Sequence, residues 1–182
     1  MDSRARSVSG PMPWLPRRLR APGRDAVRLR HDLEKDLHDG AAAGMSALAL
    51  ELGLISMAAD DPGLGARIDA AQGLLRRVLE DLRGIGTALY PPVLVSGGLG
   101  PALNALAEHR NLRLRLDLPR EELGAETRSR VGLLVADHLH TLSAGTTVGV
   151  RVRGRRLVRV RITDRQPGLP RPRHHRAVLR CA

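Results

Sequence analysis

A histidine and an aspartate stand side by side at positions 38 and 39, near the beginning of a long helical pattern. A neutral imidazole is a nucleophile near pH 7, because its ordinary pKa of about 6.5 leaves most of it deprotonated. The carboxylate of Asp39 can accept the Nδ1 hydrogen of His38, which fixes the tautomer and leaves Nε2 as the attacking atom. We therefore interpret His38 as the acceptor of a phosphoryl group. The alternative is a surface histidine beside a surface aspartate, with no chemical role.

The residues that follow His38 predict a helix over residues 25–59. Apolar side chains recur at steps of three and four residues, which is typical of one helix face: Ala41, Met45, Leu48, Leu52, Ile55 and Ala59. His38 lies three residues before this stripe begins. We expect the histidine to sit on a rigid helix, where the apolar face runs out toward solvent.

A second helix is expected over residues 66–89, after a turn at residues 60–65. Its apolar residues follow an unbroken heptad pattern, which is typical of a bundle seam: Ile68, Ala71, Leu75, Val78, Leu82, Ile85 and Leu89. Two helices joined by a short loop form an antiparallel hairpin, which buries only one seam. We therefore predict a homodimer in which two hairpins form a four-helix bundle. A bundle within one chain is the alternative, but the sequence lacks two more long helices.

The net charge of +11 is concentrated at the two ends of the 182-residue chain. Residues 1–30 carry eight Arg and two Asp, and residues 151–182 carry eleven Arg and one Asp. The ends therefore carry +6 and +10, which leaves −5 on the middle. A basic chain suggests nucleic-acid binding, but the helical middle has no basic stripe. We expect no specific nucleic-acid partner, although the ends could hold acidic partners or anionic surfaces without specificity.

Cysteine content and hydropathy give expectations about location. The single cysteine, Cys181, cannot form a disulfide within one chain, which fits a reducing cytoplasm. Unbroken apolar stretches fall well short of the roughly 18 residues that a spanning helix needs. We therefore predict a cytoplasmic protein with no membrane span. Residues 1–24, rich in arginine and interrupted by prolines, are expected to be disordered.

Three segments together resemble the dimerisation and phosphoacceptor domain of bacterial sensor histidine kinases, in the subfamily paired with NarL/LuxR-type response regulators. They are residues 36–40 on the first helix, residues 89–94 at the end of the second, and residues 98–103 at the start of the next element. The resemblance covers about residues 25–110. It implies that His38 is phosphorylated, that Asp39 is its base, and that the partner is the receiver domain of a response regulator. We also consider another histidine kinase as a partner of this chain.

The resemblance also implies an ATP-binding domain of the Bergerat type over residues 96–168. We expect strands at residues 112–118, 148–152 and 157–162, and a helix at residues 121–142. Asp164 and Gly168 match the family's glycine box, whose aspartate receives the adenine amino group. Gln166 stands where this box has its first glycine, although glycine there allows dihedral angles that glutamine does not readily adopt.

ATP and Mg²⁺ are the cofactors that the resemblance implies, but the helix that should bind the metal departs from the family. Val135 and Leu139 occupy the positions of its glutamate and asparagine, and an apolar side chain cannot ligate Mg²⁺. Asp137, His138 and His140 would supply ligands only under a shifted alignment. A solvated helix face is the simpler interpretation, so we predict no metal ligands.

These observations predict an α+β fold. A long antiparallel hairpin over residues 25–95, paired in a dimeric four-helix bundle, precedes an incomplete α/β-sandwich ATPase-like domain over residues 96–168 and a disordered basic tail over residues 169–182. The expected function is phosphoryl transfer through His38 to a response-regulator aspartate. The alternatives are an inactive dimeric scaffold that forms mixed bundles with other kinases, and a basic nucleic-acid-binding protein.

Overall fold

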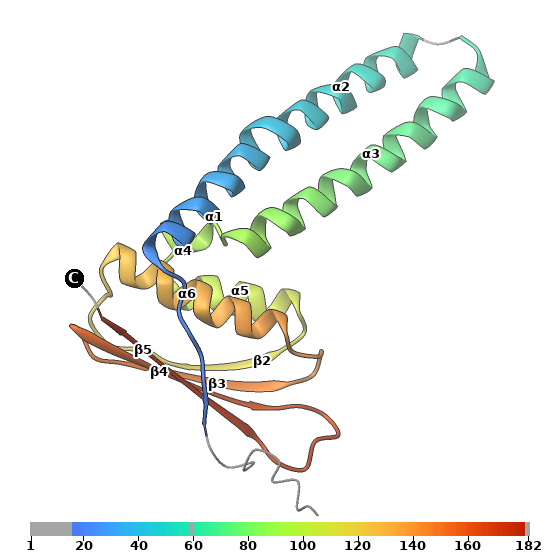
Figure 1. The fold of residues 1–182 in the computed structure, drawn as a ribbon. Helices are drawn as coiled ribbons and strands as arrows, with labels where there is room; N and C mark the ends of the chain where they lie inside the picture. Colours follow the sequence, from blue (N-terminus) through green and yellow to red (C-terminus); the bar gives the residue numbers. More distant parts are fainter. Residues whose placement is uncertain (1–15, 59, 181–182) are drawn as a thin grey trace, which may run out of the picture. The chain divides into compact units, whose positions relative to one another are not determined.

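The computed structural model describes residues 16–58 and 60–180 and has the predicted α+β fold (Figure 1). The chain divides into two compact units. Residues 22–98 form a helical unit, and residues 99–180 with residues 16–21 form a sheet unit. Residues 1–15, which were predicted to be disordered, and Ala59 and Cys181 lie outside the described residues.

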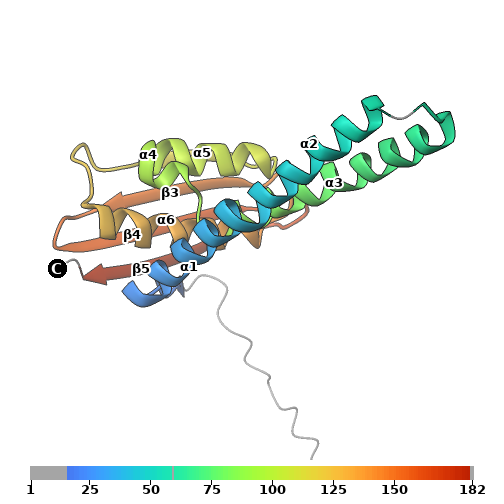
Figure 2. The same cartoon turned by 90° about the horizontal axis from the view of Figure 1, so that it is seen from above.

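The helical unit is an antiparallel hairpin, as predicted (Figures 1 and 2). Its first arm is continuous through α1 (Arg24–Asp36), a π-helical turn η1 (Leu37–Ala42) and α2 (Ala43–Ala58). Its second arm is α3 (Pro62–Leu89), which is followed by the short α4 (Val93–Ser96).

The second arm begins four residues earlier than the sequence predicted. Asp61 caps α3, because its carboxylate accepts hydrogen bonds from the backbone N–H groups of Gly63 and Leu64 at 2.9 and 3.3 Å. Pro62 follows in the first turn, where its missing N–H costs nothing. Residues that read as a turn from their glycines and proline therefore belong to a capped helix.

α3 carries two apolar faces, of which the hairpin covers one. Ile68, Leu75 and Leu79 are buried against the rest of the unit. Val78 and Ile85 belong to the predicted heptads, yet 39% and 51% of their surfaces are exposed. The single chain thus leaves an apolar face uncovered along α3, as a helix of a larger bundle would.

One helix within the described residues meets the length and hydropathy of a membrane span. The continuous helix Arg24–Ala58 contains an 18-residue window with a mean hydropathy of 1.6. Alanines between the leucines keep this average high although the apolar run is interrupted. A helix of a soluble bundle passes the same test, so this is weak evidence, and the expected absence of a membrane span stays a prediction.

The sheet unit consists of two helices and one five-stranded mixed sheet. Its helices are α5 (Leu99–His109) and α6 (Ala125–His140). Its strands are β1 (Arg17–Arg18), β2 (Arg113–Asp117), β3 (Thr147–Arg153), β4 (Leu157–Arg165) and β5 (Arg173–Arg180), in the order β1-β5-β4-β3-β2. The outer pairs β1–β5 and β2–β3 are parallel, and the inner pairs are antiparallel.

Two segments from the basic ends of the chain form strands where the sequence predicted disorder. Residues 173–180 form β5 because alternate side chains, His175, Ala177 and Leu179, are buried. The arginines between them conceal this period of two in the sequence. β1, from the N-terminal segment, then pairs with β5 and extends the sheet.

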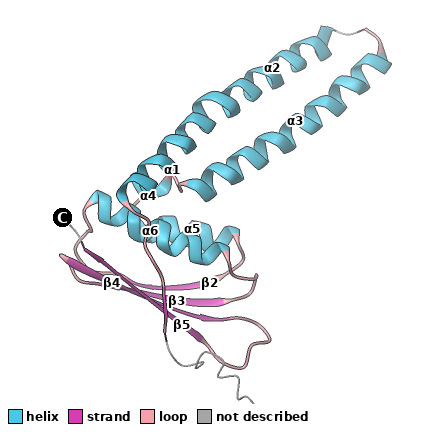
Figure 3. Cartoon of the chain, viewed as in Figure 1, coloured by secondary structure: helices cyan, strands magenta, loops and turns pink. Residues whose placement is uncertain are grey.

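α5 and α6 lie on one face of the sheet (Figure 3). The core between them is aliphatic: Val131, Val135 and Leu139 of α6 have no exposed surface, and neither do Val148, Val152 and Val158 of the strands. The opposite face carries the alternate residues of each strand, which are exposed. The sheet unit is therefore a two-layer sandwich with one open face.

The cap of α3 can be tested with two neighbouring aspartates. Asp61→Ala removes the acceptor for two helix-end N–H groups and should destabilise the helical unit by about 1 kcal/mol. Asp60→Ala is the matched control, because Asp60 is exposed and accepts neither bond. Thermal unfolding followed by circular dichroism compares the two variants, and equal melting temperatures would contradict the capping role.

Candidate functional site

His38 and Asp39 lie within the π-helical turn η1, on the first arm of the hairpin. Gly40 and Gly44 lower the α-helix propensity around this turn by roughly 1 kcal/mol each. A π-helical turn holds one more residue than an α-helical turn, so it rotates the following helix by about 100°. The predicted stripe is accordingly shifted: Met45 and Leu52 are half-buried, whereas Leu48 and Ile55 are about half exposed.

The two side chains of the turn make the contact that the sequence predicted. Nδ1 of His38 lies 3.2 Å from Oδ1 of Asp39. Three quarters of the imidazole surface and 61% of the aspartate side chain are exposed. An ionised carboxylate can only accept, so Nδ1 carries the hydrogen and Nε2 keeps its lone pair. The structure therefore presents an accessible nitrogen nucleophile, oriented by its neighbour.

The second segment of the resemblance packs against the first arm of the same hairpin. The rings of Tyr90 and His31 have their centroids 4.8 Å apart. Only 4% of Tyr90 is exposed, and Leu94, which ends the segment, is buried as well. Residues 89–94 thus fasten the end of α3 to α1 in the unit that carries His38.

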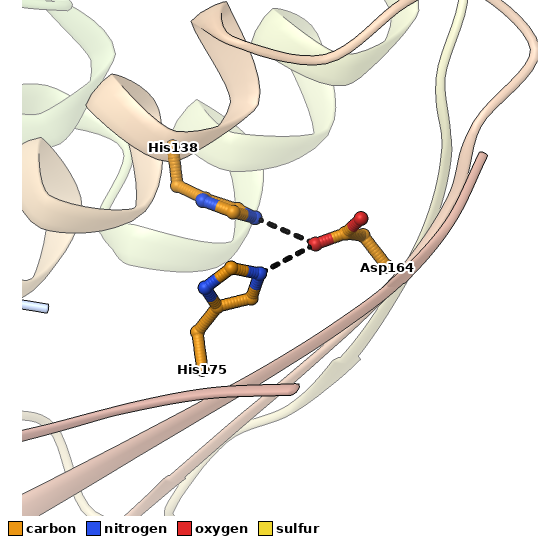
Figure 4. Close-up of side chains that lie close together, drawn as sticks. All are labelled: His138, Asp164 and His175. Atoms are coloured by element: carbon orange, nitrogen blue, oxygen red, sulfur yellow. Dashed lines mark hydrogen bonds and ion pairs between the residues drawn. The ribbon is translucent and has the colours of Figure 1, made fainter. Parts of the chain in front are cut away.

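A second cluster of titratable side chains lies in the sheet unit, around Asp164 of β4 (Figure 4). Its carboxylate has no exposed surface. Nε2 of His138 and Nε2 of His175 lie 3.1 and 2.8 Å from Oδ2, and Nε of Arg173 lies 2.8 Å from Oδ1. We call Asp164, His138, His175 and Arg173 the Asp164 cluster. It ties α6, β4 and β5 together.

The charges of this cluster follow from burial and from Arg173. Burial lowers the pKa of His138 below the ordinary 6.5, although Asp164 acts in the opposite direction. Burial and the neighbouring His138 lower the pKa of His175 likewise. Burial alone would raise the pKa of Asp164, but the hydrogen bond and charge of Arg173 hold it below 3.8. The cluster is therefore an ionised carboxylate with two neutral imidazoles that donate Nε2–H.

The Asp164 cluster also contains the one candidate set of metal ligands among the described residues. The ligand atoms of His138, Asp164 and His175 lie within 4.8 Å of one another. Both imidazoles would have to give up the hydrogens that satisfy Oδ2, and the guanidinium of Arg173 repels a cation at this carboxylate. The geometry favours a hydrogen-bonded cluster.

An ATP–magnesium site does not fit the residues present. Asp164, predicted to receive adenine, is fully buried and bound by three side chains of its own chain. Val135 and Leu139, at the positions expected to bind the metal, are fully buried in the core. Gly168 lies between β4 and β5 with a φ of +79°, so the backbone conformation accounts for glycine there.

Comparison with known proteins supports the interpretation of the helical unit. Residues 30–94, which include His38 and Asp39, match the model of a histidine kinase family. The match confirms the resemblance of this part of the chain to sensor histidine kinases. No curated protein matches the chain significantly.

Among solved structures, the chain is similar to the blue-light activated histidine kinase of Erythrobacter litoralis EL346. The sequence identity is 18% and the TM-score is 0.30, and the match covers 72% of this chain. It covers 46% of that kinase, so the chain spans less than half of its length.

The sequence identified the exposed pair and missed the buried cluster. His38 and Asp39 are adjacent in sequence, so their contact needed only a helix. His138 was considered only as a metal ligand under a shifted alignment, and His175 was placed in a disordered tail, yet 7% and 5% of their surfaces are exposed. The available signal was the alternation of His175, Ala177 and Leu179, which marks a strand with His175 on its inner side.

The Asp164 cluster predicts that acid destabilises the sheet unit. The two imidazoles have lower pKa values in the folded chain than the ordinary 6.5, so the unfolded chain binds more protons below this pH. Stability is therefore lost as the pH falls below about 6.5. Asp164 adds a further loss only below its ordinary 3.8.

Melting temperatures of the full chain between about pH 7.5 and 5.5 measure this effect. Wild type should melt at a lower temperature at the acid end, and His138→Gln should show a smaller difference between the two pH values. His174→Gln is the control. His174 is exposed and lies next to His175 on β5, so this variant should behave like wild type. A melting temperature that rises on acidification would mean that the imidazoles are charged.

Proposed function

We propose that this chain is a phosphoacceptor: His38 receives a phosphoryl group from a separate, complete histidine kinase and passes it to an aspartate of a response-regulator receiver domain. The observation that carries the proposal is the exposed His38–Asp39 pair, within the segment that matches the histidine kinase family. The transfer uses the accessible Nε2 of His38 and needs no other side chain of this chain as a nucleophile.

The transfer can be written with the two residues in defined roles. Asp39 holds the Nδ1 hydrogen while Nε2 attacks the γ-phosphorus of ATP held by the other kinase. An N–P bond forms, the P–O bond to the leaving ADP breaks, and the imidazole ring gains positive charge. The carboxylate of Asp39 stabilises this charge through the same hydrogen bond. A receiver aspartate then attacks the phosphorus, forming an O–P bond as the N–P bond breaks.

The donor is placed in another protein because this chain's own sheet unit does not fit ATP. The buried Asp164 and the apolar Val135 and Leu139 leave no oxygen ligands where the family binds nucleotide and metal. Phosphoryl transfer depends on metal ions that neutralise the phosphates, so autophosphorylation should be slower by several orders of magnitude.

The uncovered apolar face of α3 provides the contact with a second hairpin. Val78 and Ile85 are exposed in the single chain, and a two-fold partner would bury them in a four-helix bundle. A homodimer would cover this face. A mixed dimer with a complete kinase would cover it as well, and would bring that kinase's ATP domain to His38. Histidine kinase domains of this kind usually face the cytoplasm, where we place this chain.

The same face supports a second candidate function, an inactive scaffold. A chain that only occupies the bundle position of other kinases would need the exposed α3 face and would not need His38. The two functions therefore differ in their response to substitution of the histidine.

Phosphorylation in trans is the first test. Full-length protein, a complete kinase of the same subfamily and labelled ATP with Mg²⁺ should yield acid-labile label on this chain, and omission of the kinase should yield none. His38→Gln should abolish the label, because the nucleophile is lost. His109→Gln, at an exposed histidine of the sheet unit, should leave it unchanged. Asp39→Asn should slow labelling by about two orders of magnitude.

Label on the His38→Gln variant would contradict the proposal. No label on wild type, with a kinase that labels itself, would leave the scaffold as the supported function. Label from ATP alone would show that the sheet unit binds ATP, against the fit described above.

Dimerisation is tested by sedimentation of the full chain. Wild type should sediment with twice the monomer mass of 19.7 kDa. Ile85→Glu should weaken the dimer at least about tenfold, because a desolvated carboxylate in an apolar seam is unfavourable. Leu169→Glu is the matched control, since both side chains are about half exposed and Leu169 lies in the sheet unit. A monomeric wild type, or equal dimerisation of both variants, would contradict the predicted bundle.

A further inference from the structure

The open face of the sheet is rich in arginine. On β3, β4 and β5 the residues that point away from α5 and α6 are exposed, and arginine is the commonest type among them. The helices of this unit cover the other face alone (Figure 3). The positive charge of the chain's C-terminal end is therefore displayed on one surface of a folded sheet.

Four of these arginines form a row that crosses neighbouring strands in register. Arg151 of β3 pairs with Arg161 of β4, Arg161 with Arg176 of β5, and Arg176 with Arg18 of β1. Neighbouring strands are about 4.8 Å apart, so the guanidinium groups can follow one another at short intervals. We call Arg18, Arg176, Arg161 and Arg151 the arginine row.

The arginine row is largely without counter-charge in the part of the chain that the structure describes. Asp117 of β2 accepts from Nε of Arg151 at 2.7 Å, at one end of the row. Among the described residues, no carboxylate forms an ion pair with Arg18, Arg161 or Arg176. Like charges directly opposite each other destabilise a sheet. The row therefore costs stability in the free chain, and an anionic partner would reverse this cost.

The surface beside the row is hollowed on both sides of Arg161. One hollow is lined by Arg115, Gly149, Thr163 and His174, where Gly149 contributes no side chain. The other hollow is lined by Arg18, Arg159 and Arg176. Both hollows share Arg161, and arginine is the commonest lining residue of each, although Asp117 also lines the first hollow.

We propose that the arginine row binds the phosphodiester backbone of a nucleic acid without sequence preference. A guanidinium donates two parallel hydrogen bonds to a phosphate, and successive guanidinium groups match a linear polymer of negative charges. The strands carry no Phe, Tyr or Trp on which bases could stack, so the phosphates supply most of the binding energy. This inference is independent of His38 and concerns the sheet unit.

A nucleic acid fits this face better than a lipid surface does. Proteins that bind membrane surfaces insert apolar side chains beside their basic residues. Among the described residues of the open face, the large apolar ones that are exposed are Leu157 and Val178, both off the row. A polar and basic surface of this kind is suited to a flexible polyanion that lies along it.

Fluorescence anisotropy with a labelled oligodeoxythymidine of about 20 nucleotides tests the proposal on the full chain. Arg161→Gln with Arg176→Gln removes the centre of the row. Arg76→Gln with Arg77→Gln removes the same charge from exposed positions of α3 and is the matched control. The row variant should bind at least about tenfold more weakly than wild type, and the control within about twofold. Between about 50 and 200 mM salt, the slope of log affinity against log salt should flatten by about 1.4, as expected for two lost phosphate contacts.

The row variant should melt at the same or a higher temperature than wild type, because it relieves repulsion between neighbouring strands. Equal loss of affinity in both variants would overturn the proposal in favour of overall net charge. Binding to phosphatidylserine vesicles that depends on the row, without binding to the oligonucleotide, would overturn it in favour of a membrane surface.

Discussion

A carboxylate with no access to water must be satisfied by protein donors, and Asp164 imposes this constraint on the sheet unit. Two imidazoles and one guanidinium meet it, and they come from α6 and β5. The cluster therefore joins the covering helix to two neighbouring strands. It also means that Asp164, which the sequence predicted to receive adenine, is used within the core of the sheet unit.

The two halves of the chain place their polar chemistry differently. In the helical unit, the His38–Asp39 contact lies on an exposed π-helical turn, where a partner can reach it. In the sheet unit, the comparable contact between imidazole and carboxylate is sealed from solvent. Similar groups are thus accessible to a partner in one place and form a structural connection in the other, and burial makes the difference.

Local patterns made the hairpin and the exposed pair predictable. The contact between His38 and Asp39 joins adjacent residues, and the strands around Gly154 alternate clearly. The π-helical turn was not predictable from a period of three and four residues, because one additional residue changes the phase without leaving a mark in composition. The start of α3 was predicted too late. Asp61 caps this helix, but its residue type is also typical of turns, so the segment was interpreted as a turn.

The Asp164 cluster depended on long-range pairing, which no local pattern contains. β5 pairs with β4 across a connection rich in proline and arginine, and only the alternation of His175, Ala177 and Leu179 indicates a strand there. The composition of this region predicted disorder, although the alternation indicated a strand. The proximity of His175 to His138 was therefore not predicted from the sequence. The arginine row has the same origin, because register between strands brings its members together.

We propose that Nε2 of His38 accepts a phosphoryl group from a separate kinase while Asp39 holds the Nδ1 hydrogen. Phosphorus NMR of the chain, after incubation with a complete kinase and ATP, measures this most directly, because the two nitrogen-linked phosphohistidines have different chemical shifts. We expect one signal, from the Nε2-linked form, which disappears in His38→Gln. A signal from the Nδ1-linked form would contradict the role of Asp39, and a signal that persists in His38→Gln would contradict the assignment of the phosphoacceptor.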